Sequence, residues 1–124
     1  MSDPLRIAIV EDNEVFREAL ELLLGLERGI EVVCSLGDGA EAVERLPVLA
    51  PDVVVVDYRL PGLDGVEATA ALRVACPAAA VLALTANADP EAREALLAAG
   101  AVDCVGKDRE LSEIVGAIRA AGGR

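Results

Sequence analysis

The chain has 124 residues, the usual length of a single domain with one hydrophobic core. Its 22 acidic residues outweigh 11 basic ones and give a net charge of −11, which opposes binding of the bare chain to nucleic acid or anionic lipid. No histidine is present, so histidine-based catalysis and histidine-ligated zinc are excluded.

Short β-branched segments alternate along the chain with longer segments of helical periodicity. The expected strands are Leu5–Val10, Ile30–Cys34, Val53–Val56, Ala80–Leu84 and Ala101–Val105. The expected helices are Glu14–Glu27, Gly39–Leu46, Val66–Ala75, Pro90–Ala99 and Glu110–Ala121. Strict alternation predicts an α/β fold with a parallel sheet covered on both faces, a doubly wound flavodoxin-like (βα)5 domain with strand order 2-1-3-4-5.

The ends of the expected helices carry local signals. Asp38 and Asp64 each stand three residues before a glutamate, a spacing similar to a capping box, and Asp89 precedes a proline. Gly100 follows the fourth helix, where a terminating glycine is expected.

Hydrophobic residues make up 54% of the chain, although Phe16 and Tyr58 are its only aromatic residues, so an aliphatic core is expected. This content excludes a disordered chain. The apolar segments are too short for a membrane span and the N-terminus lacks a signal-peptide pattern, so we expect a cytoplasmic protein without a membrane partner. Its three cysteines are predicted to be reduced core residues.

Polar side chains follow the expected strands at their carboxyl ends, where the functional groups of doubly wound sheets gather. Glu11 and Asp12 follow the first strand, Asp57 the third and Thr85 the fourth, and Lys107 lies just beyond the fifth. Since strands one and three are neighbours in the expected order, three carboxylates converge, and their mutual repulsion calls for a cation. An all-oxygen site with room for water and a phosphate favours Mg²⁺ over zinc or copper.

Thr85 and Lys107 add a hydroxyl group and a positive charge, the groups that hold the oxygens of a phosphoryl group. Lys107 is the only lysine among eleven basic residues, which favours a confined site where a compact ammonium fits better than a guanidinium. Together these residues predict a phosphoryl acceptor at Asp57.

Over its whole length, residues 1–124, the chain resembles the receiver domain of two-component response regulators (CheY-like proteins). The resemblance rests on elements found in order at separate strand ends: Glu11-Asp12, Asp57, Pro61-Gly62, Thr85-Ala86 and Lys107. The stretches Val15-Phe16-Arg17-Glu18 and Gly106-Lys107-Asp108 are most similar to the NarL/FixJ (LuxR-type) branch. A helix-turn-helix DNA-binding output domain usually follows in that branch. We expect it to be absent from this chain, so that DNA is a partner only through it.

The resemblance implies that Asp12 and Asp57 bind Mg²⁺ directly, that the backbone carbonyl of Arg59 is a third protein ligand, and that Glu11 acts through water. It also implies that Asp57 accepts a phosphoryl group from a sensor histidine kinase and switches an output, which is expected to be transcription regulation. The chain is thus expected to be a signalling domain that undergoes only self-phosphorylation and autodephosphorylation, not a turnover enzyme. A phosphorylation-dependent homodimer is a further expectation.

By the same resemblance, Lys107 pairs with one phosphoryl oxygen while Thr85 moves to hydrogen-bond another and reports the phosphorylation state. One position departs from the family. Three residues before the lysine, where receivers usually carry a tyrosine or phenylalanine switch, this chain has Cys104. Either the response runs through Thr85 and the following loop alone, or it is weakened, whereas the phosphorylation chemistry is expected to survive.

Helix 14–27 carries more apolar residues than one buried stripe requires. One row consists of Val15, Ala19, Leu22 and Leu26, and the other of Phe16, Leu20 and Leu23. We expect extra burial in the core as the reason, and a docking surface for the kinase or a second subunit is the alternative.

Two other functions stay open. A Mg²⁺-dependent phosphatase similar to haloacid dehalogenases needs a second aspartate two residues after the nucleophile, but Arg59 stands there. A stand-alone or phosphorylation-independent receiver-like interaction module would keep the fold without the chemistry.

Overall fold

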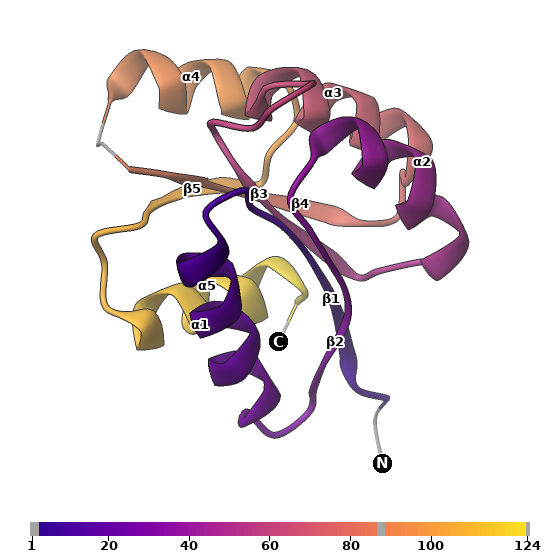
Figure 1. The fold of residues 1–124 in the computed structure, drawn as a ribbon, viewed down its shortest axis with the longest axis vertical. Coiled ribbons are helices and arrows are strands. Elements are labelled where there is room, and N and C mark those ends of the chain that lie inside the picture. Colours follow the sequence, from indigo (N-terminus) through magenta and orange to yellow (C-terminus); the bar gives the residue numbers. More distant parts are fainter. Residues whose placement is uncertain (1–2, 87–88, 124) are drawn as a thin grey trace.

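The computed structural model describes residues 3–86 and 89–123. Strands and helices alternate as the sequence predicted (Figure 1). Their bounds are β1 (Leu5–Val10), α1 (Glu14–Gly25), β2 (Ile30–Leu36), α2 (Gly39–Leu49), β3 (Val53–Asp57), α3 (Gly65–Ala75), β4 (Ala80–Thr85), α4 (Pro90–Ala98), β5 (Asp103–Gly106) and α5 (Leu111–Ala121).

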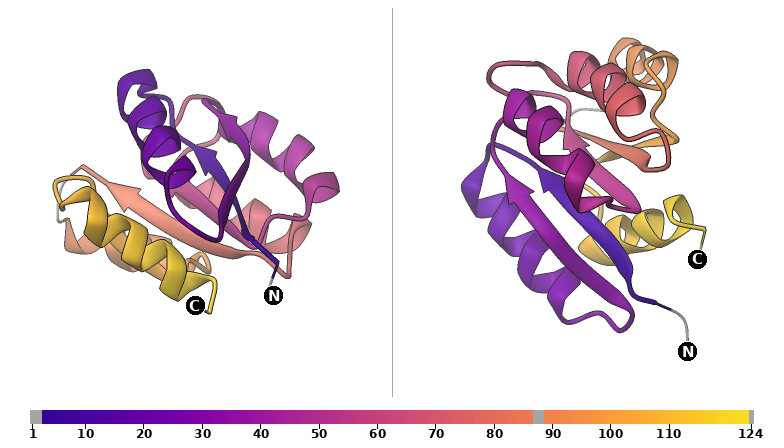
Figure 2. Two further views of the ribbon diagram at one scale, coloured as in Figure 1. Left: turned by 90° about the horizontal axis from the view of Figure 1, so that it is seen from below. Right: turned by 90° about the vertical axis from the view of Figure 1, so that its right-hand side faces the viewer.

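All five strands pair in parallel in one sheet, in the order β2-β1-β3-β4-β5, which confirms the predicted flavodoxin-like topology. Helices α1 and α5 cover one face, and α2, α3 and α4 cover the other (Figures 1 and 2). The strand order reverses at the β1–β3 pair. In a doubly wound sheet this places the functional crevice at the carboxyl ends of those two strands.

The central strands are buried on both faces because successive side chains point towards opposite helix layers. In β1, Ile7 and Ile9 belong to the cluster under α1 and α5, with Leu20. Ala8 and Val10 belong to the cluster under α2 and α3. Aliphatic side chains dominate both layers, as the composition predicted.

Two strand boundaries differ from the prediction by two residues, and the others agree to within one residue. β2 continues two residues beyond the expected end, since Val10 of β1 pairs with Leu36. β5 begins at Asp103 instead of Ala101, because the Ala101 N–H donates to the Leu96 carbonyl at the end of α4. Strand ends were therefore decided by neighbouring elements.

Two helix ends differ from the prediction by two or three residues, and the other helix boundaries agree to within one residue. α1 ends at Gly25 rather than Glu27, because the two residues that follow donate to carbonyls only three positions back. α2 passes through Pro47 to Leu49 and ends at Ala50, which has a left-handed φ of 48°. Proline removes one backbone donor, and three more residues remain helical beyond the predicted end.

The predicted start signals form real caps. The side chains of Asp38, Asp64 and Asp89 accept hydrogen bonds from backbone N–H groups of the first turn. Only Asp64 forms the reciprocal capping box, with Glu67. Gly100 takes a positive φ of 114° after α4, in agreement with its predicted terminating role.

The expectation for the outer row of α1 is wrong. Val15, Leu22 and Leu26 are 79%, 70% and 76% exposed, and Ala19 is exposed as well. α1 buries Leu20 and Leu24 against the sheet. In a helix with 3.6 residues per turn, a residue two positions from Leu20 or Leu24, such as Leu22, lies on the opposite side. The structure leaves this apolar row uncovered.

Among the described residues, no helix has the length and apolar character needed to cross a membrane. Cys76 and Cys104 are buried and Cys34 is half-buried, and all three are free thiols, as predicted.

Candidate functional site

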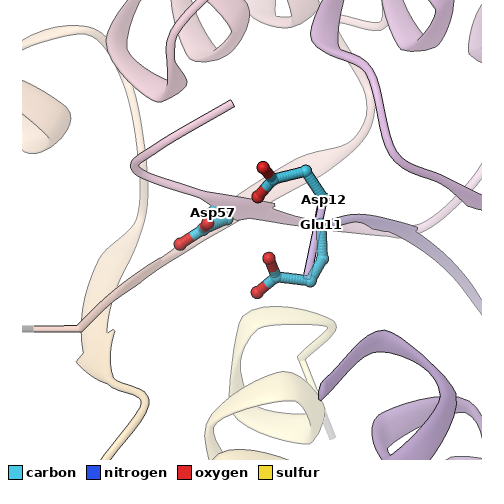
Figure 3. Close-up of side chains that lie close together, drawn as sticks. All are labelled: Glu11, Asp12 and Asp57. Atoms are coloured by element: carbon cyan, nitrogen blue, oxygen red, sulfur yellow. The ribbon is translucent and has the colours of Figure 1, made fainter. Parts of the chain in front are cut away.

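Three carboxylates meet at the carboxyl ends of β1 and β3. Val10 pairs with Val56, so the next residues, Glu11 and Asp57, lie next to each other at the edge of the sheet. Asp12 follows in the same loop, and one oxygen from each of the three carboxylates lies within 4.8 Å of the others (Figure 3). The structure thus brings together the three acids that the sequence singled out.

Glu11 is fully buried and held on several sides. Its backbone N–H donates to the Leu36 carbonyl at 2.9 Å, and its carbonyl accepts from Nη1 of Arg17 at 2.8 Å. Its Oε2 accepts from the Asn13 N–H at 2.9 Å. A buried carboxylate needs such donors, and here they fix its position at the start of α1.

Lys107 lies against the same carboxylates. Its Nζ is 2.5 Å from Oε1 of Glu11 and 3.7 Å from Oδ1 of Asp57, and its side chain is only 16% exposed. Lys107 directly follows β5 and is positioned by the pairing of that strand with β4. Thr85 pairs with Gly106, and the Lys107 N–H donates to the Thr85 carbonyl at 2.8 Å. One positive charge against three negative charges leaves the cluster short of positive charge.

Asp57 is a weaker acid here than an ordinary aspartate. Burial and the neighbouring charge of Glu11 raise its pKa to about 7, against an opposing effect of Lys107. A hydrogen bond with Glu11 and the charge of Asp12 act in the same raising direction. A cation beside Asp57 would favour its ionised, nucleophilic form over the protonated one.

The donor set suits Mg²⁺. It consists of carboxylate oxygens, with Glu11 and Asp57 buried and Asp12 exposed. Beside them is an open hollow lined by Asp12, Arg59 and Asp64, among others. Hard oxygen donors on one side and room for water on the other are what Mg²⁺ requires.

The carboxyl ends of β4 and β5, here called the β4–β5 edge, lie beside those of β1 and β3, the β1–β3 edge. The β4–β5 edge contains Thr85 and Cys104. Both are buried, and together with Arg93 they line a cavity of about 400 Å³. Arg93 of α4 donates to the Cys104 carbonyl at 2.7 Å and to Oδ1 of Asp103 at 3.3 Å. Arg93 thus joins α4 to β5 at Cys104, the position where the sequence departs from the pattern it resembles.

The sequence analysis missed three residues at these edges: Phe16, Arg17 and Arg93. Phe16 was assigned to an apolar row and to the stretch that is similar to the NarL/FixJ branch, with no role at the acidic cluster, yet its ring faces Lys107 with the centroid 4.5 Å from Nζ. The sequence held a signal for a place near the acidic cluster, because Phe16 is one of only two aromatic residues and lies four positions after Asp12. Arg17 and Arg93 carried no signal, because ten of the eleven basic residues are arginines.

Comparison with known proteins adds independent findings. A family model described as the response regulator receiver domain matches residues 7–119. The chain is 35% identical over 122 residues to a NarL transcriptional regulatory protein of Mycobacterium tuberculosis, covering 95% of this chain and 56% of that protein. The solved signal receiver domain of a NarL response regulator from M. tuberculosis has a TM-score of 0.92 and 35% identity, covering 99% of this chain and all of that one.

A relative with a different activity is also similar. A protein-glutamate methylesterase/protein-glutamine glutaminase of Myxococcus xanthus is 35% identical over 130 residues, covering 97% of this chain and 37% of that protein. The chain thus spans about half or less of the length of these curated relatives. The names of these two relatives give different activities, transcriptional regulation and ester or amide hydrolysis.

Proposed function

The chain belongs to the family of response regulator receiver domains of two-component systems, and from this premise we propose that residues 1–124 form one receiver domain with Asp57 as phosphoacceptor. The observation that carries the proposal is the contact of a buried carboxylate with two further acids and a confined lysine. A nucleophile, a cation site and a counter-charge for a phosphoryl group are thereby adjacent.

Mg²⁺ is assigned to the carboxylate cluster. Asp12 and Asp57 would bind it directly with the backbone carbonyl of Arg59, and Glu11 would act through water. When bound, the ion supplies positive charge for the phosphoryl oxygens. The polar contacts of Glu11 with Lys107 and the Asn13 N–H hold it in place for this role.

Phosphoryl transfer follows from these positions. An oxygen of Asp57 attacks the phosphorus of a phosphohistidine, so that a P–O bond forms while the P–N bond breaks and its electron pair leaves with the imidazole. Because the chain has no histidine, that donor must be a partner, a sensor histidine kinase. The Lys107 ammonium and the Thr85 hydroxyl then bind phosphoryl oxygens.

Hydrolysis of the acyl phosphate returns Asp57 to its original state. The domain thereby changes its own state once per phosphoryl group, and we assign it no turnover of an external substrate. A dehalogenase-like phosphatase is not supported, since the exposed Arg59 stands where that mechanism needs a second acid. A phosphorylation-independent module is not favoured either, because it would not require Lys107 beside Asp57.

The exposed row of α1 is assigned to partner contact. Val15, Leu22 and Leu26 form an apolar surface on the helix that begins just after Asp12, close to the acceptor. This surface suits the kinase, and a phosphorylation-dependent homodimer is the second candidate for it. Sedimentation with and without beryllofluoride, which mimics a phosphoryl group, distinguishes a dimer from a monomer.

For the output, we assign transcription regulation in the cytoplasm, exerted through a DNA-binding domain rather than through residues 1–124. Similarity to several transcriptional regulators, among them NarL of M. tuberculosis and LiaR of Bacillus subtilis, supports this assignment over methylesterase control. The net charge of −11 supports the view that these residues do not bind DNA themselves.

Incubation with Mg²⁺ and a small phosphodonor tests the acceptor. Intact-mass measurement should detect one added phosphoryl group in the wild type and in Asp108→Asn, an exposed acid beside Lys107, but none in Asp57→Asn. If no donor gives an adduct, or if Asp57→Asn is phosphorylated equally, the acceptor assignment is wrong.

A further inference from the structure

The ring of Phe16 faces the ammonium of Lys107. Phe16 lies in the first turn of α1, and Nζ of Lys107 is 4.5 Å from its ring centroid. This is within the range over which a cation is attracted to the face of an aromatic ring. The contact joins the only lysine of the chain to one of its two aromatic residues.

Besides the Phe16 ring, the Lys107 ammonium contacts two carboxylates. The Glu11 and Asp57 carboxylates are 2.5 Å and 3.7 Å from Nζ. With the side chain only 16% exposed, little water reaches it. A strongly hydrated ammonium that loses water needs other partners, and an aromatic face compensates for part of that loss where an aliphatic side chain does not.

The position of the ring is coupled to the acidic cluster through the start of α1. Oε2 of Glu11 accepts from the Asn13 N–H at 2.9 Å, and Oδ1 of Asn13 accepts from the Phe16 N–H at 3.0 Å. The cap that begins α1 therefore fixes Phe16 and Glu11 relative to each other. Glu11 and Phe16, which both contact the Lys107 ammonium, are therefore held by the same helix start.

We propose that Phe16 is a positioning residue whose ring face holds the Lys107 ammonium at the acidic cluster, where it pairs with the incoming phosphoryl group. This rests on the proposed function for its chemical consequence, although the ring–ammonium contact itself does not. An alternative is plain packing, since Phe16 is partly buried against the cluster under α1 and α5. The two roles differ in whether an aliphatic side chain can replace the ring.

The single lysine allows a direct test of the contact. In protein labelled with ¹³C-lysine, only the Lys107 side chain gives a signal. Its Cε protons should resonate upfield in the wild type and in Phe16→Tyr, because they lie in the shielding region of a ring, and should return to the ordinary position in Phe16→Leu. Identical resonances in all three proteins would overturn the contact.

Phosphorylation tests the consequence. With saturating Mg²⁺ and phosphoramidate, Phe16→Leu should be phosphorylated about three- to tenfold more slowly than the wild type, the range expected for one lost cation–π contact, and Phe16→Tyr should restore most of the rate. Mg²⁺ affinity by calorimetry should stay within about twofold in both variants if only the contact of the lysine has changed.

Leu23→Ala is the matched control, because Leu23 packs partly buried against the same cluster from the same helix. A wild-type rate in Phe16→Leu, an equally slow Phe16→Tyr, or an equally slow Leu23→Ala would each overturn the positioning role. If the wild type itself accepts no phosphoryl group, the proposed function fails, while the lysine spectra still decide whether the ring holds Lys107.

Discussion

Two neighbouring edges of the sheet are built in different ways. At the β1–β3 edge, Glu11, Asp57 and Lys107 form a tightly paired, nearly buried cluster. At the β4–β5 edge, Thr85 and Cys104 line a cavity of about 400 Å³, and a half-exposed Arg93 joins α4 to β5. We assign phosphoryl transfer to the first edge, and the second is where a receiver is expected to report it.

The difference shows which edge tolerates change. Phosphoryl transfer needs particular atoms at particular distances, and each buried charge there depends on the others for its stability. Reporting requires only that an element has two arrangements of similar energy. We therefore expect substitutions at the first edge to have large effects on chemistry, and those at Cys104 and Arg93 of the second edge, which are assigned no contact with the phosphoryl group, to leave the chemistry intact.

The largest expected effect on stability comes from Asp57→Asn without metal. Between about pH 4 and pH 7 the unfolded chain has lost the Asp57 proton while the folded protein, with a pKa of about 7, retains it, so wild-type stability falls as the pH rises. In EDTA at pH 8, Asp57→Asn should be more stable by up to about 4 kcal/mol, and this advantage should vanish towards pH 4. Urea unfolding followed by circular dichroism measures both values. Equal advantages at the two pH values would contradict the assigned cause.

Lys107→Arg keeps the charge and changes the shape. Lys107 is nearly buried between Glu11, Asp57 and the Phe16 ring, and a planar guanidinium cannot take the place of the compact ammonium there. We expect the phosphorylation rate to fall about 10²-fold, similar to the loss of one transition-state donor. Exposed Arg109→Lys is the control and should match the wild type. An unimpaired Lys107→Arg would show that charge alone suffices at this edge.

Arg93→Ala tests the second edge. It removes the bonds to the Cys104 carbonyl and the Asp103 carboxylate, and because Arg93 is half exposed we expect a loss of only about 1 kcal/mol in the free energy of unfolding. The phosphorylation rate should stay within about twofold of the wild type, since the hydrogen bonds and ion pairs of Arg93 among the described residues go to Asp103 and Cys104 and not to Glu11, Asp12 or Asp57. A large loss of rate would show that the two edges are not independent.

Gly116→Ala gives the smallest effect and separates stability from chemistry. Gly116 is an exposed position inside α5, and a Cβ added there meets no atom within 4 Å. Alanine should stabilise the helix by about 0.5–1 kcal/mol without changing phosphorylation. A thermal melt with a phosphorylation assay checks both, and destabilisation would mean that α5 is constrained at this position.

Much of the fold was readable from local sequence. Strand and helix order follows from alternating periodicity, and the aspartate caps of α2, α3 and α4 from residue type and spacing. The convergence of Glu11 and Asp57 also followed, because parallel strands that are neighbours bring their carboxyl ends together.

Other features had no local signature. The outer row of α1 has the same apolar composition as the inner row, and only packing against the sheet decides that Leu20 is buried and Leu22 is exposed. The end of β2 at Leu36 depends on its partner strand, and the passage of α2 through Pro47 on the surrounding helix.

By itself, the sequence determined the alternation of elements, the acids at the strand ends and the single lysine, because these depend on periodicity and residue type. Only the tertiary structure decided that Phe16 faces Lys107 and that Arg93 joins α4 to Cys104. The first contact joins side chains from near the two ends of the chain, and the second joins the Arg93 side chain to a backbone carbonyl of the next strand. Their existence depends on how helices are docked on the sheet, which packing of the whole domain fixes and no local pattern encodes.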